Sequence, residues 1–125
     1  MKLLGILGSV GLLLGVMLGA FAAHGLRGHL SEQMQIVFET GVRYQMYHSF
    51  AVLIAAVLVQ RNQNFFLAGI FYAIGIALFS FSLYILALTG IRWLGAITPL
   101  GGLSFMIGHA LLLIGFLRTD GNKKT

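Results

Sequence analysis

The sequence predicts an all-α integral membrane protein, a four-helix bundle in which residues 1–125 form a single domain. Three observations predict this fold class. Charged residues make up only 9% of the chain and hydrophobic residues 58%, whereas a soluble domain carries about 25% charged residues to wet its surface. The mean hydropathy is +0.94. Three uncharged runs exceed the roughly 20 residues that a helix needs to cross a bilayer.

The first expected span is residues 3–23, an uncharged run that would be about 31 Å long as a helix. Lys2 and the run that follows it also resemble a signal peptide with an A-F-A cleavage site. However, the run is longer than a usual signal-peptide core. It also carries Gly11, Gly15 and Gly19 at four-residue spacing, a stripe suited to close helix packing in lipid. We therefore expect this span to be retained.

The second expected span, residues 42–60, is unusual because its purely apolar part, residues 50–59, is too short to cross a membrane alone. To reach the far face, it must carry the polar residues of RYQMYH into the membrane. Before this span, residues 32–41 have one apolar helical face behind the N-cap Ser31. We expect this amphipathic stretch to lie at the interface and to bend into the span at Gly41.

Residues 65–89 and 94–117 are the third and fourth expected spans. Glycines fall every seven residues along the fourth and form one seam: Gly101, Gly108 and Gly115. In lipid, helices associate through close backbone approach at small residues. The glycine stripes therefore predict a tight bundle or a homo-oligomer, and the pattern does not distinguish the two. Pro99 lacks a backbone donor and is expected to kink the fourth span.

The basic residues predict the orientation of the spans. The side that holds both termini and the loop of residues 60–64 carries five of them: Lys2, Arg61, Arg118, Lys123 and Lys124. The other side carries three, which two acidic residues offset: Arg27, Arg43 and Arg92, with Glu32 and Glu39. Both termini are therefore expected in the cytoplasm. The net charge of +5 then reflects topology, and no basic stripe indicates a nucleic-acid partner.

Polar side chains from all four spans are expected to form one layer near the outer face of the membrane. Its members are His24, Glu39, Arg43, Tyr44, Gln45, Tyr47, His48, Ser82, Tyr84 and Thr98. Counted inward from the expected boundaries, His48, Tyr84 and Thr98 lie about 6–10 Å deep. Because buried polar groups in lipid need partners, this layer predicts an internal hydrogen-bonded network. Glu39 and Arg43, four residues apart, are expected to form an ion pair.

Neither a metal site nor an active site is predicted. Cysteine is absent, which excludes disulfides and thiolate ligands. The spacing of His24, His29 and His48 matches no metal-binding pattern. His109 is expected near the depth of Tyr72, bonded to a neighbouring hydroxyl and more than about 10 Å deeper than His48, too far to share an ion. No nucleophile–base pair appears, so neither an enzyme nor a cofactor is predicted.

Four stretches carry a resemblance to a known family: LGAFAAHGL (18–26), TGVRYQMYHSFAVL (40–53), FSFSLYILALTG (79–90) and TPLGGLSFMIGHALLLIG (98–115). Together they resemble uncharacterised protein family 0382 (domain of unknown function 423), small bacterial inner-membrane proteins related to animal transmembrane protein 256. The resemblance implies a four-span plasma-membrane protein without an established activity. The family's recognisable positions carry over to His24, Tyr44, Gln45, His48, Ser82, Tyr84, Pro99 and Gly101. Phe81 and His109 depart from the pattern, which puts a family-wide role for His109 in doubt.

Two functional hypotheses follow, and they differ in where the protein makes contact. In the first, it is a structural or accessory membrane protein that acts through helix contacts with itself or with a larger complex. In the second, it binds or transports a lipid or small solute through a pocket in the outer polar layer. A membrane enzyme is the least favoured interpretation.

Overall fold

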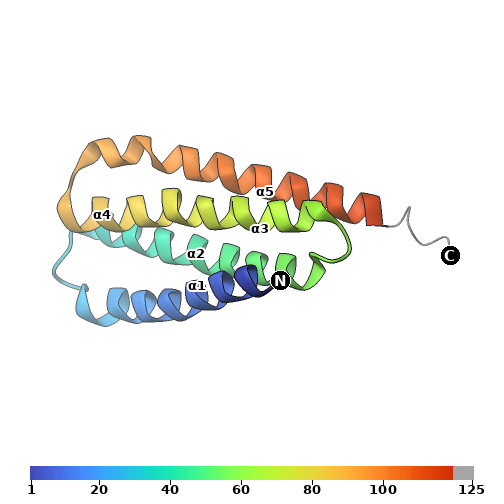
Figure 1. Ribbon diagram of the computed structural model, residues 1–125. Helices are drawn as coiled ribbons and strands as arrows, with labels where there is room; N and C mark the ends of the chain where they lie inside the picture. Colours follow the sequence, from blue (N-terminus) through green and yellow to red (C-terminus); the bar gives the residue numbers. More distant parts are fainter. Residues whose placement is uncertain (120–125) are drawn as a thin grey trace.

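The structure is a computed structural model that describes residues 1–119, and this part of the chain consists of helices joined by short turns, without a strand. Four helical segments run back and forth beside one another (Figure 1). Lys123 and Lys124, which contribute to the expected orientation, lie outside the described residues. The first segment is α1 (Lys2–Ala20) followed by the π-helical turn η1 (Phe21–Gly25), and the second is α2 (Glu32–Leu58). The third consists of α3 (Gln63–Gly75), the π-helical turn η2 (Ile76–Ser80) and α4 (Phe81–Thr89). The fourth consists of the 3₁₀ turn η3 (Arg92–Ala96) and α5 (Thr98–Thr119).

Three of the described segments are long and apolar enough to cross a membrane: Lys2–Gly25, Gln63–Thr89 and Arg92–Thr119. The fourth segment, α2, is not among them, because its first half carries the polar residues that the sequence analysis singled out. It nevertheless lies between α1 on one side and the α3–η2–α4 segment on the other (Figure 1). Neighbouring helices therefore cover much of the polar surface of α2.

The expected bend at Gly41 is wrong, because α2 continues through Gly41 as one α-helix. The Ser31 side chain caps its start by accepting the Met34 N–H at 3.1 Å, and Glu32 follows in the first turn. Gly41 serves instead as a place of close approach: a Cβ there would lie 2.8 Å from the Tyr84 ring. Residues 32–41 are thus the first turns of a long helix packed against α4, and they do not form a separate interfacial stretch.

The expected kink at Pro99 is also wrong. The fourth span is divided before the proline: η3 covers Arg92–Ala96, and α5 begins at Thr98. Pro99 therefore lies in the first turn of α5, where the absence of a backbone N–H costs no intrahelical hydrogen bond. The proline helps to begin this helix and does not interrupt it.

The glycine stripes face inward, toward other helices of the same chain. Those on α1 meet side chains of α2, and those on α5 meet the α3–η2 segment. The neighbours of an added Cβ would be Ser49 for Gly11, Met46 for Gly15, Val42 for Gly19, Phe79 for Gly101, Tyr72 for Gly108 and Phe65 for Gly115. The stripes therefore contribute to packing within one molecule.

Gly101 offers a direct test of this packing, because a Cβ there would overlap the backbone of Phe79, which cannot move aside as a flexible side chain can. Gly101→Ala is expected to lower the free energy of unfolding by about 1–3 kcal/mol, measured by denaturation in mixed detergent micelles. Its neighbour in α5, Gly102, has open space around it and provides the matched control. Gly102→Ala should be neutral or slightly stabilising, since alanine is the better helix former. Equal effects of the two substitutions would contradict the packing described.

Candidate functional site

The polar side chains gather at three levels along the helices rather than in one layer. At one end, Glu39 and Arg43 of α2 lie beside the segment that follows α1. Deeper, Gln45 meets Tyr84 of α4. Deeper still, His48 meets His109 of α5. Each level has its own partners, so the three levels differ in what they can bind or hold in place.

The middle level is a closed hydrogen-bonded group around Gln45, which is 1% exposed. Its amide nitrogen donates to the Gly11 carbonyl at 2.8 Å, and its amide oxygen accepts from the Tyr84 hydroxyl at 2.6 Å. One turn away, the Ser80 hydroxyl donates to the Gly41 carbonyl at 2.7 Å. These contacts join α1, α2 and the third segment, so this level holds helices together.

Two members of the expected layer, Ser82 and Thr98, pair with each other and not with α2. Their hydroxyl oxygens lie 2.6 Å apart, and Ser82 also donates to the Phe79 carbonyl at 2.8 Å. This contact links the third segment to the start of α5. It is a local connection and leaves no free polar group for a ligand.

The deepest level contradicts the expected separation of the two histidines. His48 Nε2 lies 3.1 Å from His109 Nε2, and His109 Nδ1 lies 2.8 Å from the Tyr72 hydroxyl. The expected contact of His109 with a neighbouring hydroxyl is thus found, with Tyr72 as the partner. The Phe105 ring stacks on His48, with centroids 3.5 Å apart.

The depth estimate failed because it counted the two histidines from opposite faces, His48 from an outer boundary at Val42 and His109 from the inner end of its span. His48 lies ten residues before the last residue of α2, and His109 lies ten residues before the last residue of α5. Both are therefore about 15 Å from the same end of the molecule. Counting both from one end would have placed them at similar depths.

The expected ion pair between Glu39 and Arg43 is absent from residues 1–119. Glu39 Oε2 accepts from the Gln35 side chain at 2.8 Å, and Arg43 donates to the Thr40 hydroxyl at 3.2 Å. Both residues are engaged with neighbours on their own helix. The guanidinium of Arg43 therefore keeps most of its five donors free.

Beside these residues lies a hollow of about 280 Å³ between the end of the first segment and α2. Arg27 and Arg43 stand at its wall together with Glu39, above the small residues Gly19 and Ala23. Arg27 donates to the Ala23 carbonyl at 3.3 Å, and it has no carboxylate partner within the described part of the chain. We call this hollow the rim hollow.

Of the other members of the expected layer, His24 and Tyr47 lie outside these groups, whereas Tyr44 belongs to the deepest one, because its carbonyl accepts from His48 Nδ1 at 2.8 Å. His24 is exposed, as is His29. Tyr47 is 58% exposed and Tyr44 is 37% exposed. In residues 1–119, no three His, Asp or Glu side chains gather as a metal-binding group.

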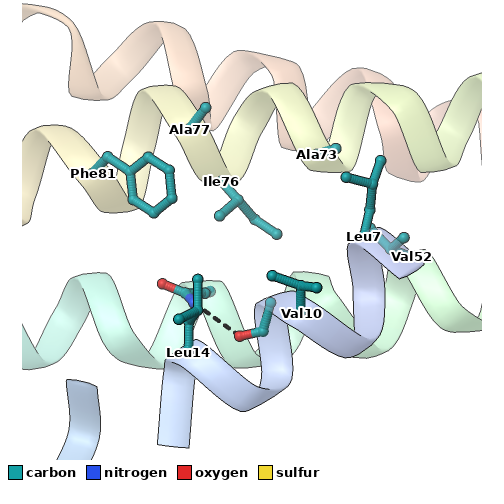
Figure 2. A pocket seen from close by; sticks show the side chains of 10 residues that line it. Leu7, Val10, Leu14, Val52, Ala73, Ile76, Ala77 and Phe81 are labelled. Atoms are coloured by element: carbon teal, nitrogen blue, oxygen red, sulfur yellow. Dashed lines mark hydrogen bonds between the residues drawn. The ribbon is translucent and has the colours of Figure 1, made fainter. Parts of the chain in front are cut away.

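A second cavity, of about 170 Å³, lies where α1 diverges from η2 and α4 (Figure 2). Leu7, Val10 and Leu14 of α1 face the opposite helix across it (Figure 2). The Gln45 amide at its floor is already bonded to Gly11 and Tyr84. This cavity is apolar, and it offers a ligand little beyond hydrophobic contact.

A family model described as "Protein of unknown function (DUF423)" matches residues 18–102. UPF0382 membrane protein SH2409 of Staphylococcus haemolyticus is 47% identical over 124 residues, which cover 97% of this chain and 100% of the relative. The chain belongs to this family.

Two further relatives are also similar to this chain over most of their length. UPF0382 membrane protein YwdK of Bacillus subtilis is 43% identical over 121 residues, 94% of this chain and 98% of the relative. UPF0382 inner membrane protein YgdD of Escherichia coli is 43% identical over 105 residues, 82% of this chain and 80% of the relative. No solved structure matches the chain. The comparisons confirm the resemblance and the membrane character that the sequence predicted.

In this DUF423 protein, sequence reasoning missed the meeting of His48, His109 and Tyr72. The family match ends at Gly102, before His109. One signal could have found the contact: Tyr72 and His109 were expected at similar depth, and an imidazole buried in lipid requires a partner at each nitrogen. Considering residues of every other helix as partners of His48, and not only those expected near the outer face, would have included His109.

The contact between Tyr84 and Gln45 can be tested by removing one hydroxyl. Tyr84→Phe leaves a buried amide oxygen without its donor and is expected to lower the free energy of unfolding by about 1 kcal/mol. Tyr47→Phe is the matched control, because Tyr47 is 58% exposed. Unfolding of both variants in mixed detergent micelles gives the measurement. Equal stability of the two variants would show that the buried contact contributes nothing.

Proposed function

We propose that this protein is a multi-pass plasma-membrane protein that binds the headgroup of a phospholipid in the rim hollow. In this proposal, its four segments form a four-helix bundle, with both termini in the cytoplasm and the rim hollow at the outer face. The excess of basic residues on the side of the termini supports this orientation. The burial of Gln45 and His48 among neighbouring helices supports α2 as the fourth span.

The observation that carries the proposal is the pair of guanidinium groups in one hollow. Arg27 and Arg43 come from different segments and line the same hollow. Neither forms an ion pair with a carboxylate in residues 1–119. Guanidinium groups match the geometry of phosphate oxygens and bind them through charge-assisted hydrogen bonds. The hollow therefore suits a phosphate.

The third charged residue of the hollow narrows the class of headgroup. Glu39 Oε2 is engaged by Gln35, which leaves the other carboxylate oxygen free to accept a hydrogen bond. A carboxylate beside two guanidiniums suits a headgroup that carries an ammonium next to its phosphate. A phosphoethanolamine headgroup has this combination, with three ammonium donors for the Glu39 carboxylate.

The position of the hollow along α2 fits a headgroup. About 20 helical residues span the hydrocarbon layer. Counted from Leu58 at the other end of α2, the layer ends near residue 39, next to Glu39 and Arg43. Exposed Trp93 lies in η3, at the same end of the molecule (Figure 1), as expected for an interfacial aromatic residue. Gly19, Ala23 and Val42 at the hollow leave room for the glycerol and the first part of the acyl chains.

The accessory hypothesis rested on the glycine stripes, and these pack against other helices of the same chain. They therefore provide little reason to expect a partner. Catalysis is not part of the proposal, because the rim hollow holds no nucleophile beside a base: its charged lining residues are Arg27, Glu39 and Arg43. Binding without turnover is the function that this geometry supports best.

Native mass spectrometry of the purified protein with added lipid tests the proposal. A phospholipid with a phosphoethanolamine headgroup is expected to bind more tightly than a diacylglycerol with the same chains. Replacing both arginines, in Arg27→Gln with Arg43→Gln, should weaken binding of the phospholipid roughly tenfold. Charge-assisted contacts at this partly exposed site are expected to contribute about 1–2 kcal/mol together.

Arg92→Gln is the matched control, since Arg92 is an exposed arginine that lies outside the hollow. It should leave the affinity unchanged. The proposal is wrong if the diacylglycerol binds as tightly as the phospholipid, or if Arg92→Gln weakens binding as much as the double substitution does.

A further inference from the structure

A continuous hydrogen-bonded chain crosses three helices at the deepest polar level. The Tyr44 carbonyl oxygen lies 2.8 Å from His48 Nδ1, and His48 Nε2 lies 3.1 Å from His109 Nε2. His109 Nδ1 then lies 2.8 Å from the Tyr72 hydroxyl. Every ring nitrogen of the two histidines therefore has a partner. The chain joins α2 to α5 and α3.

The position of each proton in the neutral chain follows from its two ends. A backbone carbonyl only accepts, so His48 Nδ1 must carry a hydrogen and donate it to Tyr44. A neutral imidazole has one N–H, which makes His48 Nε2 an acceptor. His109 Nε2 must then be the donor between the rings. This leaves His109 Nδ1 to accept the hydroxyl hydrogen of Tyr72.

We propose that His48 and His109 together form a binding site for one proton in the middle of the membrane. His109 Nε2 passes its proton to His48 Nε2, which now donates to His109 Nε2, while one proton from water adds to His109 Nδ1. His109 passes from one tautomer to the other, its Nε2 giving up a proton and its Nδ1 gaining one, so the added charge stays on the pair. The new Nδ1–H donates to the Tyr72 oxygen, and the Tyr72 hydroxyl hydrogen turns away. No heavy atom has to move.

The same geometry limits the pair to a single proton. With a second proton, both imidazoles would be cations and both Nε2 atoms would carry hydrogen. Two N–H groups would then face each other across 3.1 Å, without an acceptor between them. Repulsion between two adjacent positive charges in a site of low dielectric constant would add to this cost. The pair is therefore expected to titrate as one unit.

No negatively charged group of the described residues lies beside the pair to balance the charge of a bound proton. Titratable neighbours are Tyr44 on α2 and Tyr72 on α3, while α5 and η2 contribute the rings of Phe105 and Phe79. No carboxylate contacts the pair in the described part of the chain. The pair therefore holds at most one proton and contains no fixed ion pair.

A polar stripe on α2 provides the route to the pair. Thr40, Tyr44 and His48 follow one another at four-residue spacing, so they lie on one face of the helix. Thr40 is bonded to Arg43 at the rim, and Tyr44 is 37% exposed. The stripe therefore leads from the rim to the pair along one face of α2.

The number of protons bound by His48 and His109 tests the proposal. The full chain, labelled with ¹⁵N-histidine in lipid nanodiscs, is titrated from about pH 8 to about pH 5, across the usual histidine range, and the ring nitrogen signals are followed by NMR. The signals of His48 and His109 should show the uptake of one proton between them, with a common midpoint.

Single His→Gln substitutions at each of the four positions assign the signals. Uptake of two protons by His48 and His109, with separate midpoints, would show two independent groups and overturn the proposal. Unchanged His48 and His109 signals across this pH range would show a purely structural contact and would overturn it too. The measurement on the unsubstituted chain decides between these results even if a variant does not fold.

Discussion

A polar group in the hydrocarbon layer is costly unless it forms a hydrogen bond within the protein. This constraint determines how the other helices pack around α2. Its apolar part is too short to cross a bilayer, so amide, hydroxyl and imidazole groups lie at membrane depth. The buried amide and imidazole meet groups from other helices, Gln45 meeting Gly11 and Tyr84 and His48 meeting His109. The buried Ser49 hydroxyl is an exception, because it has no hydrogen-bond partner in the described part of the chain. The other helices are arranged so that these contacts form, and the glycines allow the backbones to come close enough.

The buried contacts differ in what they can do. The amide of Gln45 has a fixed donor side and a fixed acceptor side, so its bonds to Gly11 and Tyr84 can exist in only one arrangement. The imidazole pair can exchange donor and acceptor roles along its length. At the rim, Arg27 and Arg43 have donors to spare. Fixed contacts suit a structural role, whereas reversible or incomplete ones suit binding, which is why the two proposals concern the rim and the histidine pair.

Much of the architecture could be predicted from the sequence. The low charge content and the long apolar runs predicted an all-helical membrane chain, and this is confirmed. Predictions were wrong at positions where the residue type is compatible with two different local structures. Gly41 suits a bend as well as a close contact, and Pro99 suits a kink as well as a first turn. Neighbouring helices decide between these meanings, and a single sequence does not show where those neighbours lie.

The histidine contact was missed for a different reason. Depth along a helix is known only relative to an assumed boundary, and the depths of His48 and His109 were counted from boundaries at opposite faces. Errors of a few residues at the two boundaries, at about 1.5 Å per residue, add together in the predicted separation. Contacts between residues 61 positions apart depend on such offsets in two helices at once. They are therefore far more sensitive to the assumed boundary than helix content is.

The wide turn η2 in the third segment has a consequence for the register of the residues that follow it. A π-helical turn holds about one residue more than an α-helical turn, so the chain beyond Ser80 is rotated by about 100° relative to an uninterrupted helix. This rotation directs the Tyr84 side chain toward Gln45, to which its hydroxyl donates. Deleting one residue between 76 and 80 would restore a regular α-helix and turn the Tyr84 side chain away from Gln45. The composition of the segment would hardly change.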